Sequence, residues 1–335
     1  MSALVRIAVT GSIATDHLMT FAGRFSDSLL EEQLDRVSLS FLVDDLEIRR
    51  GGTAANISFG MANLGLRPLL VGSVGEDFAD YRAWLERHGV DCSGIRTSLL
   101  KHTARFVCTT DQNHAQIASF YAGAMTESRE IELAPLWTAE PIDLVLIGPT
   151  DPVAILRHAQ ECRDRGIPFA ADISQQLAFA DGDMIRRYIE GAAYLFSNDY
   201  EAGLIEKKTG WSGDEVLQRV GLRVTTHGEK GSVIDGRWQG EPIEPITVPV
   251  VPARRLADPT GVGDGFRAGF LAGLSWGLGP QQCAQVGSTL ATLVIETIGP
   301  QEYDLTRVDF LDRLAGAYGA DAAAAIEPHL TSVRH

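Results

Sequence analysis

A glycine-rich segment that ends in a carboxylate is the part of this sequence best suited to chemistry. Residues 258–264 read DPTGVGD, and the apolar stretch GFRAGFLAGLSWGL follows at once. A glycine-rich turn that opens a helix directs free N–H groups and the positive end of the helix dipole at one point, which suits a phosphoryl group in transfer. Gly261, Val262 and Gly263 would supply these N–H groups, and Asp264 could accept a hydroxyl proton. On spacing alone, the segment could equally be a turn and a helix cap.

Such a segment needs a scaffold, and the order of elements predicts a layered one. The stretch VRIAVT at 5–10 is a buried strand, and TAANISFGMANL at 53–64 has helical spacing of apolar residues. Beyond residue 141 the strands DLVLIG, FAADI, AYLFS and LRVTTHG alternate with helices. This alternation builds a mainly parallel sheet covered on both faces, so we predict a three-layer α/β/α domain.

Two stretches depart from this alternation and predict a small β-sheet lid. SLSFLVDDLEI favours strand because of its β-branched and aromatic residues, and TARFVCTTD and AQIASFYAG flank a turn as a hairpin does. We expect the lid to comprise 15–50 and 100–122, and the large domain to comprise 1–14, 51–99 and 123–335. The apolar residues of SLSFLVDDLEI would leave one lid face uncovered, which predicts a homodimer joined through the lids.

Composition and charge disfavour several kinds of partner. The 335 residues carry a formal net charge of −15, so we expect neither a nucleic-acid polymer nor an anionic membrane surface as a partner. We find no signal-peptide pattern and no apolar run long enough to span a membrane. The four cysteines lack metal-ligand spacing, so a reducing compartment and a cytoplasmic location are predicted.

The glycine-rich segment resembles the D-T-x-G-A-G-D signature of the ribokinase-like carbohydrate and nucleoside kinases, the PfkB family. GGTAAN at 51–56, LG at 64–65 and GSVGED at 72–77 resemble the family's N-terminal signature, GG-x-x-x-N followed by LG and G-x-x-G-x-D. The two signatures together are far more specific than either alone. The resemblance implies a ribokinase-like fold with a lid, and ATP-dependent phosphoryl transfer with Asp264 as the base.

The same resemblance implies where an acceptor sugar would bind. Ser12 and Asp16 match the segment G-x-x-x-x-D, whose carboxylate accepts hydrogen bonds from sugar hydroxyls. Gly52 and Asn56 would contact the same sugar. The alternatives are a turn acid at Asp16 and a polar residue on a helix surface at Asn56.

The resemblance also implies a site for ATP with Mg²⁺. Asn198 and Glu201 match the motif N-x-x-E, which positions magnesium-bound water and the phosphates. Residues i and i+3 share a helix face, so both side chains can act on one metal shell. The alternative is an N-cap Asn followed by a surface Glu.

Two further segments are implied to serve the nucleotide. Thr226, Gly228 and Gly231 match T-x-G-x-x-G, whose glycines permit close backbone approach to ATP, although a hairpin turn is the alternative. Asp258 and the carbonyls of 296–299 resemble a monovalent-cation site, usually for potassium. Pro259 and Val262 depart from the common signature, which leaves cation dependence open.

The acceptor is indicated by the segment after the strand FAADI. Sugar kinases of the family commonly carry D-x-N-x-R there, whereas this chain has DISQQ. Two neutral amides, Gln175 and Gln176, suit a nucleoside better than a phosphorylated sugar. Phe106 and Phe120 could stack on a purine, or could be core residues.

Four segments, GSIATDHLM, SLSFLVDDLEIRRGG, HTARFVCTTD and SQQLA, are similar to bacterial adenosine kinases of the actinobacterial type. This resemblance selects adenosine as acceptor, phosphorylated at its 5′-hydroxyl to AMP in purine salvage. The alternatives are a sugar kinase of the ribokinase or fructokinase type and a catalytically silent nucleoside-binding protein. A dinucleotide-binding oxidoreductase is disfavoured because no G-x-G-x-x-G follows the first strand.

Overall fold

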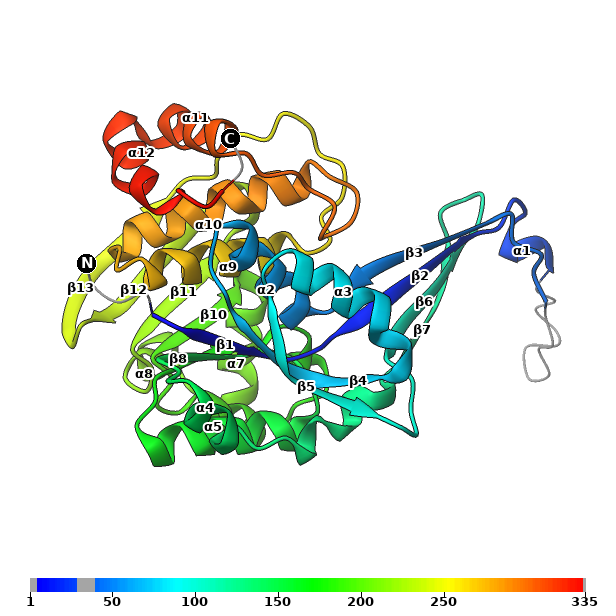
Figure 1. The fold of residues 1–335 in the computed structure, drawn as a ribbon, viewed down its shortest axis with the longest axis horizontal. Coiled ribbons are helices and arrows are strands. Elements are labelled where there is room, and N and C mark those ends of the chain that lie inside the picture. The colour runs from blue at the N-terminus through cyan, green and yellow to red at the C-terminus, as the bar shows by residue number, and fades with distance from the viewer. Residues whose placement is uncertain (1–4, 29–39, 334–335) are drawn as a thin grey trace.

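A nine-stranded sheet forms the centre of the large body in this computed structural model, which describes residues 5–28 and 40–333 (Figure 1). The strand order is β13-β12-β11-β10-β9-β8-β1-β4-β5. Neighbouring strands from β5 to β11 are parallel, whereas β12 and β13 are antiparallel additions at one edge. The strands are β1 (Ile7–Thr10), β4 (Leu69–Gly75), β5 (Asp91–Ser98), β8 (Leu144–Ile147), β9 (Phe169–Asp172), β10 (Tyr194–Asn198), β11 (Leu222–Thr226), β12 (Ser232–Trp238) and β13 (Glu241–Val248).

Helices cover both faces of this sheet because its strands are apolar on both sides. In β1, Ile7 and Val9 join one buried cluster while Ala8 joins the other, as the alternation of side chains along a strand requires. The helices of the first cluster are α2 (Thr53–Asn63), α3 (Ala79–Arg87), α9 (Val262–Ser275), α10 (Pro280–Ile295), α11 (Arg307–Tyr318) and α12 (Ala320–Ile326). The helices of the second are α4 (Ala134–Ala139), α5 (Pro152–Arg165), α6 (Gly182–Ile189), α7 (Asp199–Thr209) and α8 (Gly213–Leu217). The predicted three-layer architecture is confirmed.

Short 3₁₀ helices connect several of these elements. They are η2 (Glu76–Phe78), η3 (Gly123–Glu130), η4 (Ser174–Ala178), η5 (Gly228–Lys230) and η6 (Glu327–His329). Within the described ranges, no helix is both long and apolar enough to cross a membrane.

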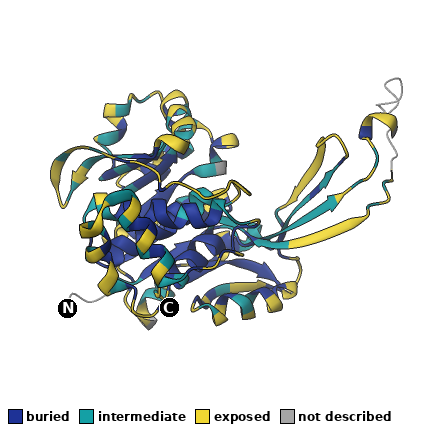
Figure 2. Ribbon diagram, turned by 90° about the horizontal axis from the view of Figure 1, so that it is seen from above, coloured by how far each residue is buried: buried dark blue, intermediate teal, exposed yellow. Residues whose placement is uncertain are grey.

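A second sheet projects from the body (Figure 1). Its order is β3-β2-β6-β7, formed by β2 (Ala14–Thr20), β3 (Asp45–Gly51), β6 (Ala104–Thr110) and β7 (Gln116–Tyr121). The strands β6 and β7 pair as the predicted hairpin, and the short helix α1 (Phe25–Ser28) lies at the far end of the sheet. Much of the sheet is exposed or half-buried, in contrast to the buried centre of the body (Figure 2). Part of the expected lid, 29–39, lies outside the described residues.

The carboxyl ends of β1, β8, β9 and β10 meet at one edge of the large sheet because these strands are parallel. The strand β1 pairs with β8 on one side and β4 on the other, so the direction of winding reverses there. Ligands of doubly wound sheets bind at such reversal points, outside the carboxyl ends of the strands. The chain passes from β1 through 11–13 directly into β2, which places the second sheet beside this edge.

Candidate active site

The glycine-rich segment forms the start of α9, as its sequence predicts. Gly261 precedes the helix with φ 77°, in the left-handed region, and a Cβ added there would lie 2.4 Å from Pro300 Cβ. Glycine is therefore required on both conformational and steric grounds. Val262, Gly263 and Asp264 form the first turn, where backbone N–H groups lack intrahelical acceptors. The Val262 N–H donates to the Pro259 carbonyl over 3.3 Å, which leaves the Gly261 and Gly263 N–H groups for an anion.

Asp264 is held in place by a chain of amide side chains. Asn56 Nδ2 donates to Asp264 Oδ2 over 2.8 Å, and Gln301 Nε2 donates to Asn56 Oδ1 over 2.9 Å. Gln301 Nε2 also lies 2.5 Å from Tyr81 Oη, which donates to the Gly51 carbonyl over 2.9 Å. Asn56 is buried, so it is not the polar surface residue of the alternative interpretation.

The surroundings of Asp264 favour a proton on its carboxyl group. Burial raises its pKa to about 7, and the carboxylates Asp172 and Glu201 act in the same direction, whereas Arg267 and Asn56 oppose the rise. A carboxylate with a pKa near 7 is a stronger base at neutral pH than an exposed one. Asp264 is therefore suited to accept a proton from a hydroxyl group.

A buried arginine, Arg267, lies one turn along α9 from Asp264. Its Nη2 contacts Asp172 Oδ1 at 2.8 Å and Ser174 Oγ at 3.1 Å, and lies 4.0 Å from Glu201 Oε2. Asp172 is fully buried at the end of β9. Our sequence interpretation assigned no role to Arg267. The sequence did contain a signal for Arg267, namely a cationic residue inside an apolar helix. Such a residue needs carboxylate partners if it is to be buried.

Asn198 and Glu201 form a reciprocal cap at the start of α7. Asn198 Oδ1 accepts from the Glu201 N–H and Glu201 Oε2 accepts from the Asn198 N–H, each over 2.8 Å. The capping role of the alternative interpretation is therefore present. Glu201 is half-buried rather than on the open surface, and burial raises its pKa.

The charges around Arg267 fit a divalent cation that arrives with a nucleotide. Asp172, Glu201 and Asp264 place three carboxyl groups around one guanidinium group. Mg²⁺ is commonly held by one or two carboxylates together with phosphate oxygens and water. Among the residues with assigned positions, no group of three or more His, Cys, Asp and Glu side chains could hold a metal ion by itself. The site suits a metal that is shared with phosphates.

The segment 226–231 connects β11 to β12, which are antiparallel, so it is the hairpin connection of the alternative interpretation. Thr226 ends β11, and the turn closes through the His227 N–H and the Gly231 carbonyl over 2.7 Å. Gly228 has φ 56°, and a Cβ built there would meet no atom within 4 Å. The backbone at Gly228 is accessible to a ligand, so a hairpin and a nucleotide segment are compatible.

Ser12 and Gly52 join the first strand to α2. Ser12 Oγ accepts from the Thr53 N–H over 3.0 Å, so this hydroxyl supports the helix start. Gly52 has φ 92°, and a Cβ there would lie 2.6 Å from the Ser12 carbonyl oxygen. The two backbones therefore approach each other closely only because residue 52 is glycine.

Four side chains form a transverse row across the projecting sheet. Asp16 pairs with Arg49 of β3 and with Phe106 of β6, and Phe106 pairs with Phe120 of β7. Directly paired residues share one face of a sheet. Arg49 Nη1 lies 3.4 Å from Asp258 Oδ2, so this face is turned toward the glycine-rich segment. Phe120 is 55% exposed, which excludes a core position for it.

The two amides after β9 lie in η4. Gln176 Nε2 donates to the Thr150 carbonyl over 2.5 Å, next to the end of β8. Gln175 belongs to the same turn, and its side chain lies outside the described part of the structure. Ser174 adopts φ 35°, and its Oγ donates to Asp172 Oδ1 over 2.5 Å.

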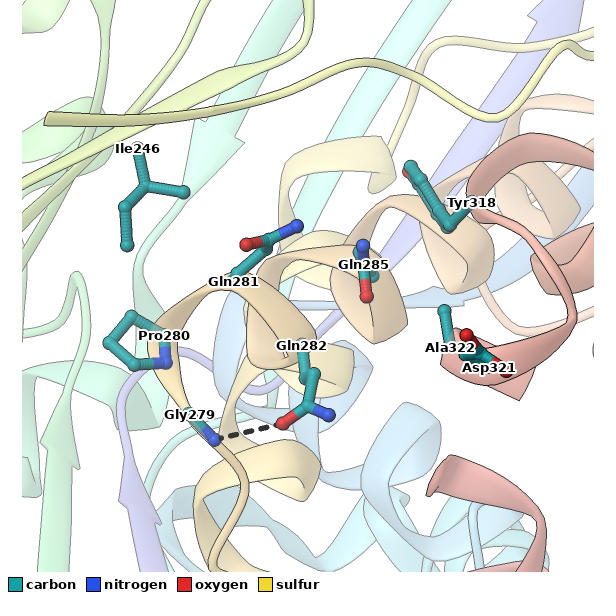
Figure 3. Close-up of a pocket in the computed structure, with 9 residues that line it drawn as sticks. All are labelled: Ile246, Gly279, Pro280, Gln281, Gln282, Gln285, Tyr318, Asp321 and Ala322. Carbon is teal, nitrogen blue, oxygen red and sulfur yellow. Dashed lines mark hydrogen bonds between the residues drawn. The ribbon is translucent and has the colours of Figure 1, made fainter. Parts of the chain in front are cut away.

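A cavity of about 470 Å³ lies beside the first turn of α10, near Pro280 (Figure 3). Its lining includes Ile246, Gln285, Tyr318 and Asp321. Gln282 accepts a hydrogen bond from the Gly279 N–H at its edge. None of the predicted site residues lines this cavity, so it is separate from the site around Asp264.

The fold and the glycine-rich segment define a phosphotransferase family. The chain matches the pfkB family carbohydrate kinases over residues 10–307, and it belongs to this family. The nucleoside kinase of Methanocaldococcus jannaschii is 30% identical over 253 residues, which cover 75% of this chain and 80% of that relative. The structure of Burkholderia thailandensis nucleoside kinase in complex with inosine has a TM-score of 0.81 and 35% identity, and covers 93% of this chain and 97% of that one. The predicted family and its ribokinase-like fold are confirmed.

Proposed function

We propose that this chain is an ATP-dependent adenosine kinase that phosphorylates the 5′-hydroxyl and releases AMP and ADP, as a step of purine salvage. The observation that carries the proposal is the row on the projecting sheet. Asp16 can accept hydrogen bonds from ribose hydroxyls, and Phe106 and Phe120 beside it can stack on a purine. A row with a carboxylate and two aromatic rings suits a nucleoside better than a free sugar.

The similar proteins support a nucleoside acceptor. Both are named nucleoside kinases, and one of them was determined with inosine, which is a purine nucleoside. Adenosine has the same ribose and a closely related base. The preference for adenosine over other nucleosides rests on the motifs of the sequence and on the proposed stacking of its base.

The proposed reaction is an in-line displacement at the γ-phosphorus of ATP. The 5′-oxygen forms a bond to the γ-phosphorus of ATP, the bond from that phosphorus to the β–γ bridging oxygen breaks, and ADP leaves. Asp264 takes the hydroxyl proton as the new P–O bond forms. Asn56 fixes the orientation of Asp264. The N–H groups of Gly261 and Gly263 receive the charge of the transferring group. Bound Mg²⁺ would neutralise phosphate oxygens, and Glu201 would hold it through water.

Thr226, Gly228, Gly231 and Asn198 are proposed to line the ATP side of the site. Asn198 and Thr226 are the last residues of the parallel neighbours β10 and β11, and Gly228 and Gly231 lie just beyond the end of β11. The substrate side is proposed to comprise Ser12, Asp16, Gly52, Asn56 and the two amides Gln175 and Gln176. The projecting sheet would then act as a lid over the site in which the acceptor and ATP meet.

The outer face of this lid supports a homodimer. Leu46, Ile48, Ile117 and Tyr121 are all on the face opposite to Asp16, and each is at least 46% exposed. An exposed apolar face of this kind is often covered by a second copy.

The proposal is tested by measuring ADP release with a set of acceptors. We expect adenosine to give the highest kcat/KM, followed by other purine nucleosides, with free ribose and fructose far lower. A higher kcat/KM for ribose or fructose would favour a sugar kinase. No ADP release with any acceptor would instead support a silent nucleoside-binding protein.

A further inference from the structure

The carboxylate that the family resemblance assigns to a monovalent cation is already engaged by protein donors. Asp258 Oδ1 accepts from the Thr260 N–H over 2.9 Å, and Oδ2 accepts from the Gly299 N–H over 3.1 Å and lies 3.4 Å from Arg49 Nη1. Burial raises the pKa of Asp258, but the bonds from Thr260 and Gly299 and the nearby Arg49 outweigh burial and hold it below its ordinary value. The carboxylate is therefore ionised and has a cationic partner.

Arg49 is oriented toward Asp258 by a neighbour on its own strand. Its Nε and Nη2 donate to the two oxygens of Glu47 over 2.7 and 2.6 Å, which leaves Nη1 directed at Asp258. A Cβ at Gly299 would lie 3.4 Å from Arg49 Cδ, so the arginine stem packs on that glycine. A bidentate pair fixes the plane of a guanidinium group, so this orientation is specified rather than incidental.

A second arginine, Arg255, donates a hydrogen bond to another of the expected cation ligands. Arg255 Nε donates to the Glu296 carbonyl over 2.6 Å. A monovalent cation needs several oxygen atoms that are free of stronger donors. The Asp258 carboxylate and the Glu296 carbonyl each already face a guanidinium group, whose positive charge repels a further cation, so this donor set does not fit a potassium site.

We propose that the Arg49 guanidinium group takes the place of the monovalent cation at Asp258. It supplies a fixed positive charge beside 258–261, the loop that leads into α9, without direct contact with the reacting atoms. Arg49 is thus a positioning residue that acts through Asp258 on the anion-binding turn. This inference rests on the proposed kinase function.

The replacement links the lid to the anion-binding turn. Arg49 lies on β3 directly opposite Asp16 on β2, so the positive charge that faces Asp258 and the carboxylate proposed to bind ribose lie on one pair of hydrogen-bonded strands. A free ion would bind the turn whether or not the lid were in place. An arginine on the lid strand completes the turn only when the lid is in the position described here.

The test compares wild type with Arg49→Gln in KCl and in choline chloride at a constant ionic strength of about 0.1 M, so that screening is equal. We expect the wild-type kcat to change by less than about twofold between the two salts, since no ion is needed. Arg49→Gln should lose roughly 10- to 100-fold in choline, as expected for a lost charged hydrogen bond, and regain most of it in KCl.

Arg50→Gln is the matched control. It removes the same charge from the next residue along the chain, and Arg50 contacts Glu302 rather than Asp258. Thermal unfolding gives a second readout that does not depend on activity. Potassium should raise the Tm of Arg49→Gln by about 2–4 °C and leave wild type and Arg50→Gln unchanged.

Four results would overturn the proposal. In the first, potassium activates the wild-type enzyme several-fold; in the second, Arg49→Gln is as active as wild type in choline. In the third, potassium does not restore the kcat that Arg49→Gln has lost. In the fourth, Arg50→Gln responds to potassium as strongly as Arg49→Gln does. If no acceptor supports ADP release, the proposed kinase function fails. The Tm response to potassium still decides the role of Arg49 in that case.

Discussion

Asn56 on α2 donates a hydrogen bond to Asp264 on α9 across a separation of 208 residues in the chain. The bond ties the helix of the N-terminal signature to the helix of the glycine-rich signature. It also engages one carboxylate oxygen, Oδ2, so the proposed acceptor hydroxyl would bind the other. The two signatures therefore meet in one hydrogen bond.

We predict that Asp264→Asn lowers kcat by about 10²–10⁴-fold, the usual contribution of a general base. The amide keeps the size of the side chain and can still accept from Asn56, so the Tm should not fall. Coupled ADP release and thermal unfolding measure the two effects. A variant that retained more than about a tenth of the wild-type kcat would mean that Asp264 only caps a helix.

The pH dependence of activity follows from the pKa of Asp264, which burial raises to about 7. Only the ionised form can accept the proton, so kcat/KM should fall about tenfold per pH unit below that pKa. The residual activity of Asp264→Asn should lack this acidic limb. A wild-type profile that is flat from about pH 5 to pH 8 would contradict the assignment.

Ionisation of Asp264 should have opposite effects on stability and on activity: as pH rises, stability should fall while activity rises. Because the folded pKa of Asp264 lies above its ordinary value of 3.8, its contribution to stability is full at acidic pH and is lost as pH rises through about 7. Asp264→Asn does not titrate, so its Tm relative to wild type should increase from about pH 5 to pH 8. A constant difference in Tm would argue against a raised pKa.

Phe106→Ala and Phe120→Ala should each raise the KM for adenosine and leave the KM for ATP nearly unchanged. Loss of one stacked ring costs about 1–3 kcal/mol, or roughly 5- to 150-fold. Initial-rate measurements with each substrate varied in turn separate the two constants. Equal weakening of both substrates would indicate a folding defect rather than lost stacking.

Arg267→Met should lower the free energy of unfolding by about 3–5 kcal/mol, because it leaves Asp172 buried without its cation. The double variant Arg267→Met/Asp172→Asn should recover part of this loss. Denaturant unfolding of the four proteins in the cycle gives the coupling energy. Additive losses would show that the pair is not energetically coupled.

The proposed homodimer predicts a mass near twice 36.2 kDa by light scattering at micromolar concentration. Leu46→Asp/Ile48→Asp places two charges on the outer lid face and should reduce this mass by half. The body should keep its Tm. A wild-type mass near 36.2 kDa would refute the dimer.

Local patterns predicted the parts of this molecule whose signals are contiguous in the chain. The helix α2, the strand β1, the hairpin of β6 and β7 and the glycine-rich start of α9 are all read from short stretches. The edge strands β12 and β13 were not predicted, because our interpretation of alternating strands and helices ended at β11.

The partners of the site residues were harder to predict because they are distant in sequence. Gln301 is 245 residues from Asn56, and Arg267 is 93 residues from Ser174. No spacing rule joins such residues, and only the packed sheet and helices bring them together. Composition and periodicity define elements, whereas these contacts depend on topology.

The transverse row on the projecting sheet, if it binds the acceptor as proposed, restricts how the acceptor preference can evolve. Adjacent residues of a strand point to opposite faces, so insertion of one residue in β2 or β6 before Asp16 or Phe106 would turn that side chain to the opposite face. Descendants of this chain can therefore diversify by substitution within the row, or by insertions of two residues that preserve the face. Insertions of a single residue in homologous sheets should therefore be confined to the turns between strands.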